Sequence, residues 1–104
     1  MSVYVDAAAH GFRRRLMCHM LADTPAELHA MAEKIGIKRR WYQRAASTPH
    51  YDVCKTKRAL AVAAGAVEIT QRELVGVIRS IRQHIMTDSL IGKQWIEDYK
   101  RELK

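Results

Sequence analysis

The sequence predicts an α+β fold: a small mixed sheet of short strands with two packed helices, followed by two C-terminal helices. Three observations predict it. Short runs rich in β-branched and aromatic residues alternate with two helical segments up to about residue 70. Each of those helical segments ends at a glycine. From there on, apolar residues recur at helical spacing. We therefore expect one domain, with an α+β core at residues 1–70 and a helical extension at 71–104.

The first element is a strand over "SVYVDA". Alternation puts Val3 and Val5 on one face and Tyr4 and Asp6 on the other, so the strand ends in a carboxylate. The following "AAHGFRRR" is expected to be a loop, because Gly11 interrupts it and three arginines favour solvent. The apolar "LMCHMLAD" predicts a second, buried strand.

The clearest helix signal is "DTPAELHAMAEKIG". Thr24 is the expected N-cap, Pro25 occupies the first helical position, and Glu27 would complete a capping box. Gly36 is expected to end the helix. His29 lies one position off the apolar stripe and is expected at the surface. The residues that form the stripe are Leu28, Met31, Ala32 and Ile35.

The middle of the chain returns to extended structure. "IKRRWYQ" is expected to be extended and "RAASTP" a loop. "HYDV" predicts a short strand, because it follows Pro49 and is rich in strand-forming residues. Thr56 is the expected cap of a second helix, "KRALAVAAGA", which Gly65 ends. In "AVEIT" we expect a strand with Val67 and Ile69 on one face.

The C-terminal region predicts two helices. Thr70 and Glu73 form a second capping box, and the final helix is expected to begin at Asp88 or Ser89. The apolar face of the first helix could pack on the core or pair with its copy in a homodimer. An exposed Trp95 would favour the homodimer. The residues of that face are Leu74, Val75, Val77, Ile78, Ile81 and Ile85.

Composition limits the classes of protein. Of the 104 residues, 48% are hydrophobic and 28% charged, which is typical of a globular domain. No apolar run approaches the roughly 20 residues of a membrane helix, and the start lacks a secretory pattern, so we expect a cytoplasmic protein with no membrane partner. Cys18 and Cys54 have no paired spacing and are expected to be reduced. The net charge of +7 favours a polyanionic partner, although a merely solvated basic surface explains it equally well.

Four residues predict a polar site: Asp6, His19, His50 and Asp52. His50 and Asp52 share a strand face at i and i+2, and the two earlier strands could bring Asp6 and His19 alongside. Such a group could hold Mg, Mn or Zn as a cofactor, or support general acid–base catalysis by His50, Asp52 and Asp6. In the alternative, the aspartates cap turns and the histidines form core hydrogen bonds.

Other residues are candidates for binding a nucleotide or nucleic acid. Cations at a helix start oppose the helix dipole, unless an anion binds there. The candidate phosphate ligands are Lys57, Arg58, Arg13, Arg14 and Arg15. Aromatic side chains near cations can stack on bases, and equally can pack in a core. The candidates for base stacking are Tyr4, Tyr51 and Trp41.

Three segments resemble one bacterial and phage family. "VYVD", "HMLADTPAELHAMAEKIGIKRRWYQ" and "HYDV…KRALAVAAGAVEIT" are similar, in order and spacing, to domain of unknown function 4031, with Tyr-Val-Asp and His-Tyr-Asp as its motifs. The likeness covers residues 3–73. It implies that Tyr4–Asp6 and His50–Asp52 act as a unit. It also implies a phage or prophage origin, and hence a place in the host cytoplasm.

Two functions remain open. The first is a phosphate-directed site of a metal-dependent nuclease or nucleotide hydrolase. The second is a non-catalytic interaction protein that binds nucleic acid or a host protein through its basic face and C-terminal helices. No glycine-rich phosphate loop, G-x-S-x-G elbow or H-E-x-x-H motif is present, which disfavours P-loop, serine hydrolase and zincin chemistry.

Overall fold

The structure, a computed structural model, describes residues 2–7, 10–12, 15–43, 48–87 and 89–102. It confirms the α+β class. The strands are β1 (Val3–Asp6), β2 (His10–Phe12), β3 (Arg15–Ala22), β4 (Tyr42–Gln43), β5 (His50–Cys54) and β6 (Val67–Ile69). The helices are α1 (Pro25–Lys34), α2 (Lys55–Ala63), α3 (Gln71–Met86) and α4 (Leu90–Glu102), with a 3-10 turn, η1, at Arg39–Trp41.

The strands form one mixed six-stranded sheet in the order β4-β5-β3-β1-β6, with β2 also paired to β3. Long β3 lies at the centre and runs antiparallel to β1, β2 and β5, whereas β6 joins β1 in parallel. The expected loop at residues 8–15 is wrong for residues 10–12, which form β2, and for Arg15, which begins β3. A short strand at Gly11 is tolerated there because it pairs along one side only, with β3.

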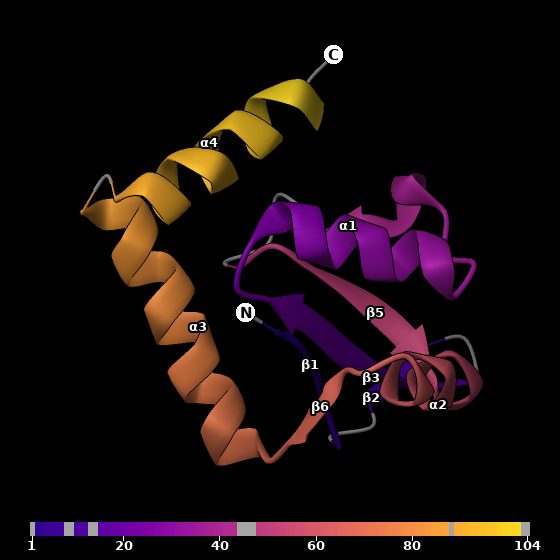
Figure 1. Cartoon of the computed structure of the whole chain (residues 1–104). Coiled ribbons are helices and arrows are strands. Elements are labelled where there is room, and N and C mark those ends of the chain that lie inside the picture. Colours follow the sequence, from indigo (N-terminus) through magenta and orange to yellow (C-terminus); the bar gives the residue numbers. More distant parts are fainter. Residues whose placement is uncertain (1, 8–9, 13–14, 44–47, 88, 103–104) are drawn as a thin grey trace.

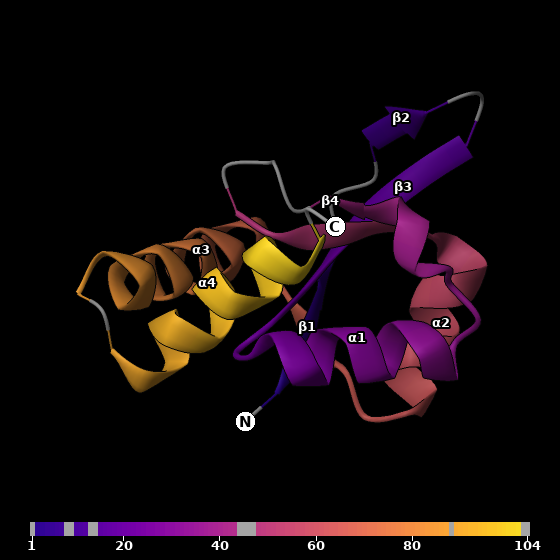
Figure 2. The same ribbon diagram turned by 90° about the horizontal axis from the view of Figure 1, so that it is seen from above.

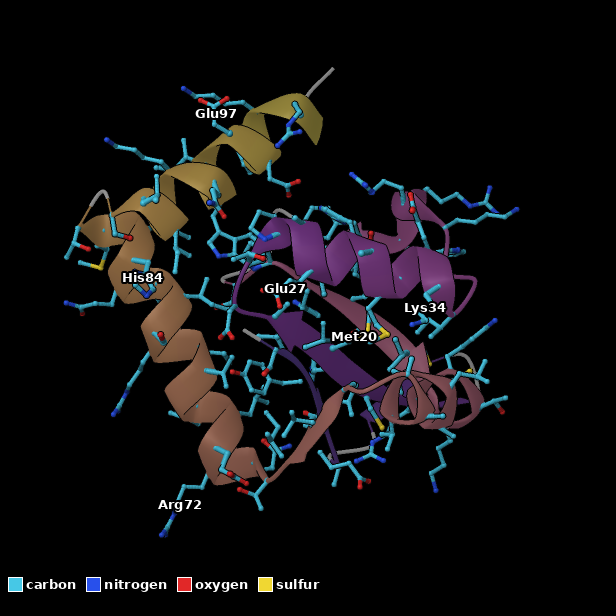
Figure 3. The ribbon with its side chains drawn as sticks, viewed as in Figure 1. Met20, Glu27, Lys34, Arg72, His84 and Glu97 are labelled. Carbon is cyan, nitrogen blue, oxygen red and sulfur yellow. The ribbon has the colours of Figure 1, made fainter. Side chains whose placement is uncertain are left out.

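Helices α1 and α2 lie on the same side of the sheet (Figure 2). Between them and the strands lie fully buried side chains, including Val5, Met20, Tyr51 and Val53. Figure 3 shows Met20 reaching from the sheet toward α1. Because side chains alternate along a strand, Asp6, His19, His50 and Asp52 belong to the opposite face of the sheet. Helices α1 and α2 therefore do not cover the sheet face that carries the four predicted polar residues.

Local signals place most helix ends. Thr24 accepts a hydrogen bond from the Glu27 backbone N–H, and Thr70 and Glu73 form the complete capping box at the start of α3. Gly36 and Gly65 take positive φ values of 81° and 108° directly after α1 and α2. The predicted cap at Thr56 is wrong, because α2 already begins at Lys55 with Cys54 as its N-cap.

Helices α3 and α4 form a hairpin in which α4 turns back toward α1 (Figure 1). Trp95, whose exposure would have favoured the homodimer, is 2% exposed, and its Nε1–H donates to the Asp23 carbonyl at 3.2 Å. Leu74 and Ile81 of α3 belong to the same buried cluster as the sheet. In the described part of the chain, none of the helices is long and apolar enough to cross a membrane.

Candidate metal centre

Strand register brings three of the four predicted polar residues together. The β3–β5 ladder pairs His19 directly with Asp52, and His50 lies two residues before Asp52 on the same strand. The intervening Tyr51 points to the buried face, as the alternation predicts. His19, His50 and Asp52 each offer one ligand atom, and these atoms all lie within 4.8 Å of one another.

The spacing of two of these atoms suits a shared ion. His50 Nε2 and Asp52 Oδ1 are 3.3 Å apart. Tetrahedral zinc with bonds of about 2.0–2.1 Å separates neighbouring ligand atoms by roughly 3.3–3.4 Å. The rings of His19 and His50 meet edge to face, with centroids 5.4 Å apart. Without a metal, the same 3.3 Å contact is compatible with a simple histidine–aspartate ion pair.

Asp6 is not one of the three grouped residues but holds His19 in place through two contacts. The carboxylate is 0% exposed; Oδ2 contacts His19 Nδ1 at 2.7 Å, and Oδ1 accepts the His19 backbone N–H at 2.7 Å. Strand β1 ends at Asp6, so its carboxylate satisfies a β3 donor beyond the last paired residues, Val5 and Met20. Asp6 and Asp52 are therefore linked through His19.

Hydrogen bonds orient both imidazole rings. His50 Nδ1 lies 2.8 Å from the Thr48 carbonyl oxygen, which can only accept, so Nδ1 carries the proton of the neutral ring. The Asp6 carboxylate assigns the proton of His19 to Nδ1 in the same way. Each neutral ring then presents Nε2 to the site. A metal-bound histidine commonly has this second contact to a carboxylate or carbonyl.

The donor set and its exposure favour a catalytic rather than a closed site. The side chains of His19, His50 and Asp52 are 31%, 18% and 29% exposed, so solvent reaches all three side chains, although Asp52 Oδ1 itself is buried. Two nitrogens and one carboxylate suit zinc or a similar transition metal better than Mg, which prefers oxygen ligands. Cys18 is a poor further ligand, because it pairs with Val53 on the buried face of the sheet, opposite to His19 and Asp52; burial also raises the pKa of its thiol.

Two of the predicted phosphate ligands, Lys57 and Arg58, donate hydrogen bonds to groups of the fold. Lys57 Nζ donates to the Ile35 carbonyl at 2.8 Å. Arg58 Nε donates to the Asp6 carbonyl at 2.8 Å, and its Nη1 pairs with Glu68. Arg13 and Arg14 lie outside the described residues, and Arg15 begins β3. Phosphate binding by these cations stays a prediction.

The three predicted stacking residues have different environments. Tyr51 as a base-stacking residue is a correction: it is 0% exposed and contacts His29, because the alternation of β5 turns it into the core. The Tyr4 hydroxyl donates to Asp23 at 3.0 Å. Trp41 is 49% exposed, with the Arg40 guanidinium 5.5 Å from its ring centroid.

The structure contains a second histidine–aspartate pair, His29 and Asp98, that was not predicted from the sequence. The expected surface position of His29 is wrong: it is buried, with Nδ1 2.9 Å from the Tyr51 hydroxyl and Nε2 2.9 Å from Asp98 Oδ1. The Tyr42 hydroxyl donates to the other Asp98 oxygen at 2.8 Å. The only available signal was the position of His29 beside the apolar stripe. The pair borders a cavity of about 680 Å³ between α1 and α4, whereas His19, His50 and Asp52 lie on the opposite face of the sheet.

Comparison with known proteins identifies the family. The family model described as "Protein of unknown function (DUF4031)" matches residues 3–81, which include Asp6 and the three residues of the candidate centre. The chain belongs to this family, and the match extends into α3, beyond the expected limit at residue 73. No curated protein and no solved structure matches the chain.

Proposed function

We propose that this DUF4031 protein binds a divalent transition-metal ion through His19, His50 and Asp52 and uses it to hydrolyse a phosphate ester of a nucleotide or nucleic acid. The observation that carries the proposal is the convergence of three ligand atoms within 4.8 Å on a solvent-facing strand pair. The Asp6 and Thr48 contacts behind the two rings support it, because they are typical of the outer shell of metal sites.

Three protein ligands leave room for water and substrate. A bound metal of this kind lowers the pKa of a coordinated water toward neutrality and polarises a phosphoryl oxygen. The chain contributes orientation: Asp6 holds His19, and the Thr48 carbonyl holds His50. The phosphate part of the proposal rests on the net charge of +7, which favours association with polyanions.

Metal binding is tested first, by thermal unfolding of metal-stripped protein titrated with Zn, Mn and Mg. A ligand at about 100 times its dissociation constant stabilises a folded protein by roughly 2.7 kcal/mol. We expect a shift of the unfolding temperature with Zn or Mn that Asp52→Asn abolishes. His84→Gln, a histidine substitution in α3 distant in sequence from the site, is the control and should retain the shift. A wild type without a shift for any metal contradicts the proposal.

Hydrolysis is tested on metal-loaded protein with bis(4-nitrophenyl) phosphate, 4-nitrophenyl phosphate and short oligonucleotides. Turnover that requires the metal and fails in Asp52→Asn supports the proposal. The substrate pattern separates phosphodiester from phosphomonoester hydrolysis. Metal binding without turnover of any of these substrates contradicts the hydrolytic part and leaves a metal-binding role.

A non-catalytic interaction protein is the second candidate. Exposed apolar side chains on helices α3 and α4 support a protein partner, either a host protein or a second copy of the chain. They are Val75, Met86 and Leu90, at 47%, 82% and 76% exposure. Sedimentation equilibrium of the wild type and of Met86→Ser tests the homodimer, which the substitution should weaken.

A further inference from the structure

Trp41 is the one large aromatic at a solvent-exposed position close in register to the centre, among the residues described. It is 49% exposed, whereas Trp95 is 2% exposed. Exposing half of an indole forgoes part of the hydrophobic stabilisation that burial of a tryptophan supplies. Such a position is typical of a side chain that contacts a partner.

Trp41 directly precedes β4, the edge strand that pairs with β5. Tyr42 pairs with Tyr51, and Gln43 pairs with His50. Trp41, the last residue of η1, comes directly before Tyr42, whose partner Tyr51 is the neighbour of Asp52 on β5. Neighbouring strands are about 5 Å apart. The backbone that carries Trp41 therefore lies at the edge of the sheet beside a ligand of the centre.

Cations surround the indole. The Arg40 guanidinium lies 5.5 Å from the ring centroid, and Lys38, Arg39 and Arg40 are all exposed. An aromatic face stacks on any nucleobase, and adjacent cations attract the phosphates on either side of that base. A base within a duplex is stacked on its neighbours and shielded, whereas a base of a single strand is available to an indole.

We propose that Trp41 and Arg40 form a base-stacking subsite that selects single-stranded nucleic acid as the substrate of the metal centre. This inference rests on the proposed function and adds the substrate class. The base stacks on the indole at the sheet edge, and the adjacent phosphate then reaches the side of the sheet on which His19, His50 and Asp52 converge.

Binding is measured without metal, so that it does not depend on turnover. Metal-stripped protein in EDTA is titrated with a 12-nucleotide oligothymidylate and with a 12-base-pair duplex. Trp95 is buried, so quenching of the intrinsic fluorescence by the oligonucleotide reports mainly on Trp41. We expect quenching by the single strand and at least tenfold weaker binding of the duplex. Equal affinity for both overturns the inference.

Variants are compared by the fluorescence anisotropy of a labelled oligonucleotide. Stacking on an aromatic is worth about 1–3 kcal/mol per base, so Trp41→Ala should weaken binding about 5- to 150-fold. Trp41→Phe should retain most of the affinity. Leu60→Ala, an exposed apolar residue of α2, is the matched control and should have no effect. Arg40→Gln should weaken binding and reduce its dependence on salt. Unchanged binding by Trp41→Ala overturns the inference.

The two proposals fail separately. If Trp41→Ala binds the oligonucleotide as the wild type does while Zn still shifts the unfolding temperature, the stacking subsite is wrong and the metal centre stands. If the wild type binds single strands through Trp41 but no metal shifts its unfolding, the substrate assignment is overturned with the metal centre, and Trp41 serves a nucleic-acid-binding protein. If no oligonucleotide binds, the exposed indole is assigned to a protein contact instead.

Discussion

Two histidine–aspartate groups lie on opposite faces of β5, and they use similar residues differently. On the exposed face, His50 and Asp52 meet His19, and Asp6 supports His19 from behind. On the buried face, Tyr51 contacts His29, whose other nitrogen contacts Asp98. The side chains of His19 and His50 are 31% and 18% exposed, against 8% and 5% for His29 and Asp98.

The two groups differ in what the second nitrogen of each histidine ring contacts. His29 uses Nδ1 for Tyr51 and Nε2 for Asp98, so both nitrogens serve the fold. His19 and His50 use Nδ1 for fixed acceptors, which turns Nε2 toward a shared solvent-facing point. A histidine–aspartate contact therefore indicates a candidate centre only where the geometry directs a second nitrogen to such a point. The buried group, by contrast, connects α4 to the sheet.

The largest expected effect is on the buried group. Asp98→Ala removes the carboxylate that contacts the buried His29 and the partly buried Tyr42, and breaking a buried pair costs about 3–5 kcal/mol. Urea unfolding should show a loss of that size, whereas the Zn-induced increment in stability should persist. Glu97→Ala on the same helix (Figure 3) is the exposed control and should change stability by less than about 0.5 kcal/mol. A loss under about 1 kcal/mol for Asp98→Ala would remove the distinction between the groups.

The second largest effect is expected from a substitution in α4 that displaces the helix carrying Asp98. A Cβ at Gly92 would lie 2.0 Å from the His84 carbonyl oxygen, so Gly92→Ala must push α4 away from α3. Overpacking of this kind costs about 1–3 kcal/mol. We expect hydrogen exchange to rise along α4 while the backbone amides of β3 and β5 keep their protection. Gly76→Ala meets no atom within 4 Å and is the matched control. Uniform destabilisation of both regions would contradict their independence.

Asp6→Asn should affect the exposed group. An amide offers one acceptor oxygen where the carboxylate serves two donors of His19, so the ring loses its fixed orientation. Loss of such an outer-shell contact typically costs 10–100-fold in metal affinity. Isothermal titration with Zn measures it. Glu68→Gln, at an exposed carboxylate, should retain the wild-type affinity. An unchanged affinity in Asp6→Asn would mean that Asp6 supports only the strand.

The smallest effect concerns Tyr4, a partly buried residue on the same strand as Asp6. Burial, and then the hydrogen bond to Asp23, raises the pKa of Tyr4 above 10.0. The protonated phenol is favoured in the folded state, so its contribution is complete below pH 10 and is lost as the pH rises through the raised value. Tyr4→Phe should cost about 1 kcal/mol at pH 7. Urea titrations from pH 7 to 11 should show a smaller alkaline loss in the variant than in the wild type; parallel curves would contradict the assignment.

The sequence by itself determined the local features. Capping residues marked the starts of α1 and α3, glycines marked the ends of α1 and α2, and alternation identified β1 and β5, because these signals depend on neighbours within a few residues. It also identified the three residues of the candidate centre and the supporting Asp6 by their chemistry.

Only the tertiary structure decided which of these residues meet. His19 faces Asp52 because of the β3–β5 register, and His29 is buried because α4 brings Asp98 to it across 69 residues of sequence. Lys57 and Arg58 likewise find acceptors on other elements, at Ile35 and Asp6. Contacts of this kind depend on the relative placement of whole elements, which no local propensity encodes. Side chains of the same two types, histidine and aspartate, therefore form a candidate metal centre on one face of β5 and a structural pair on the other.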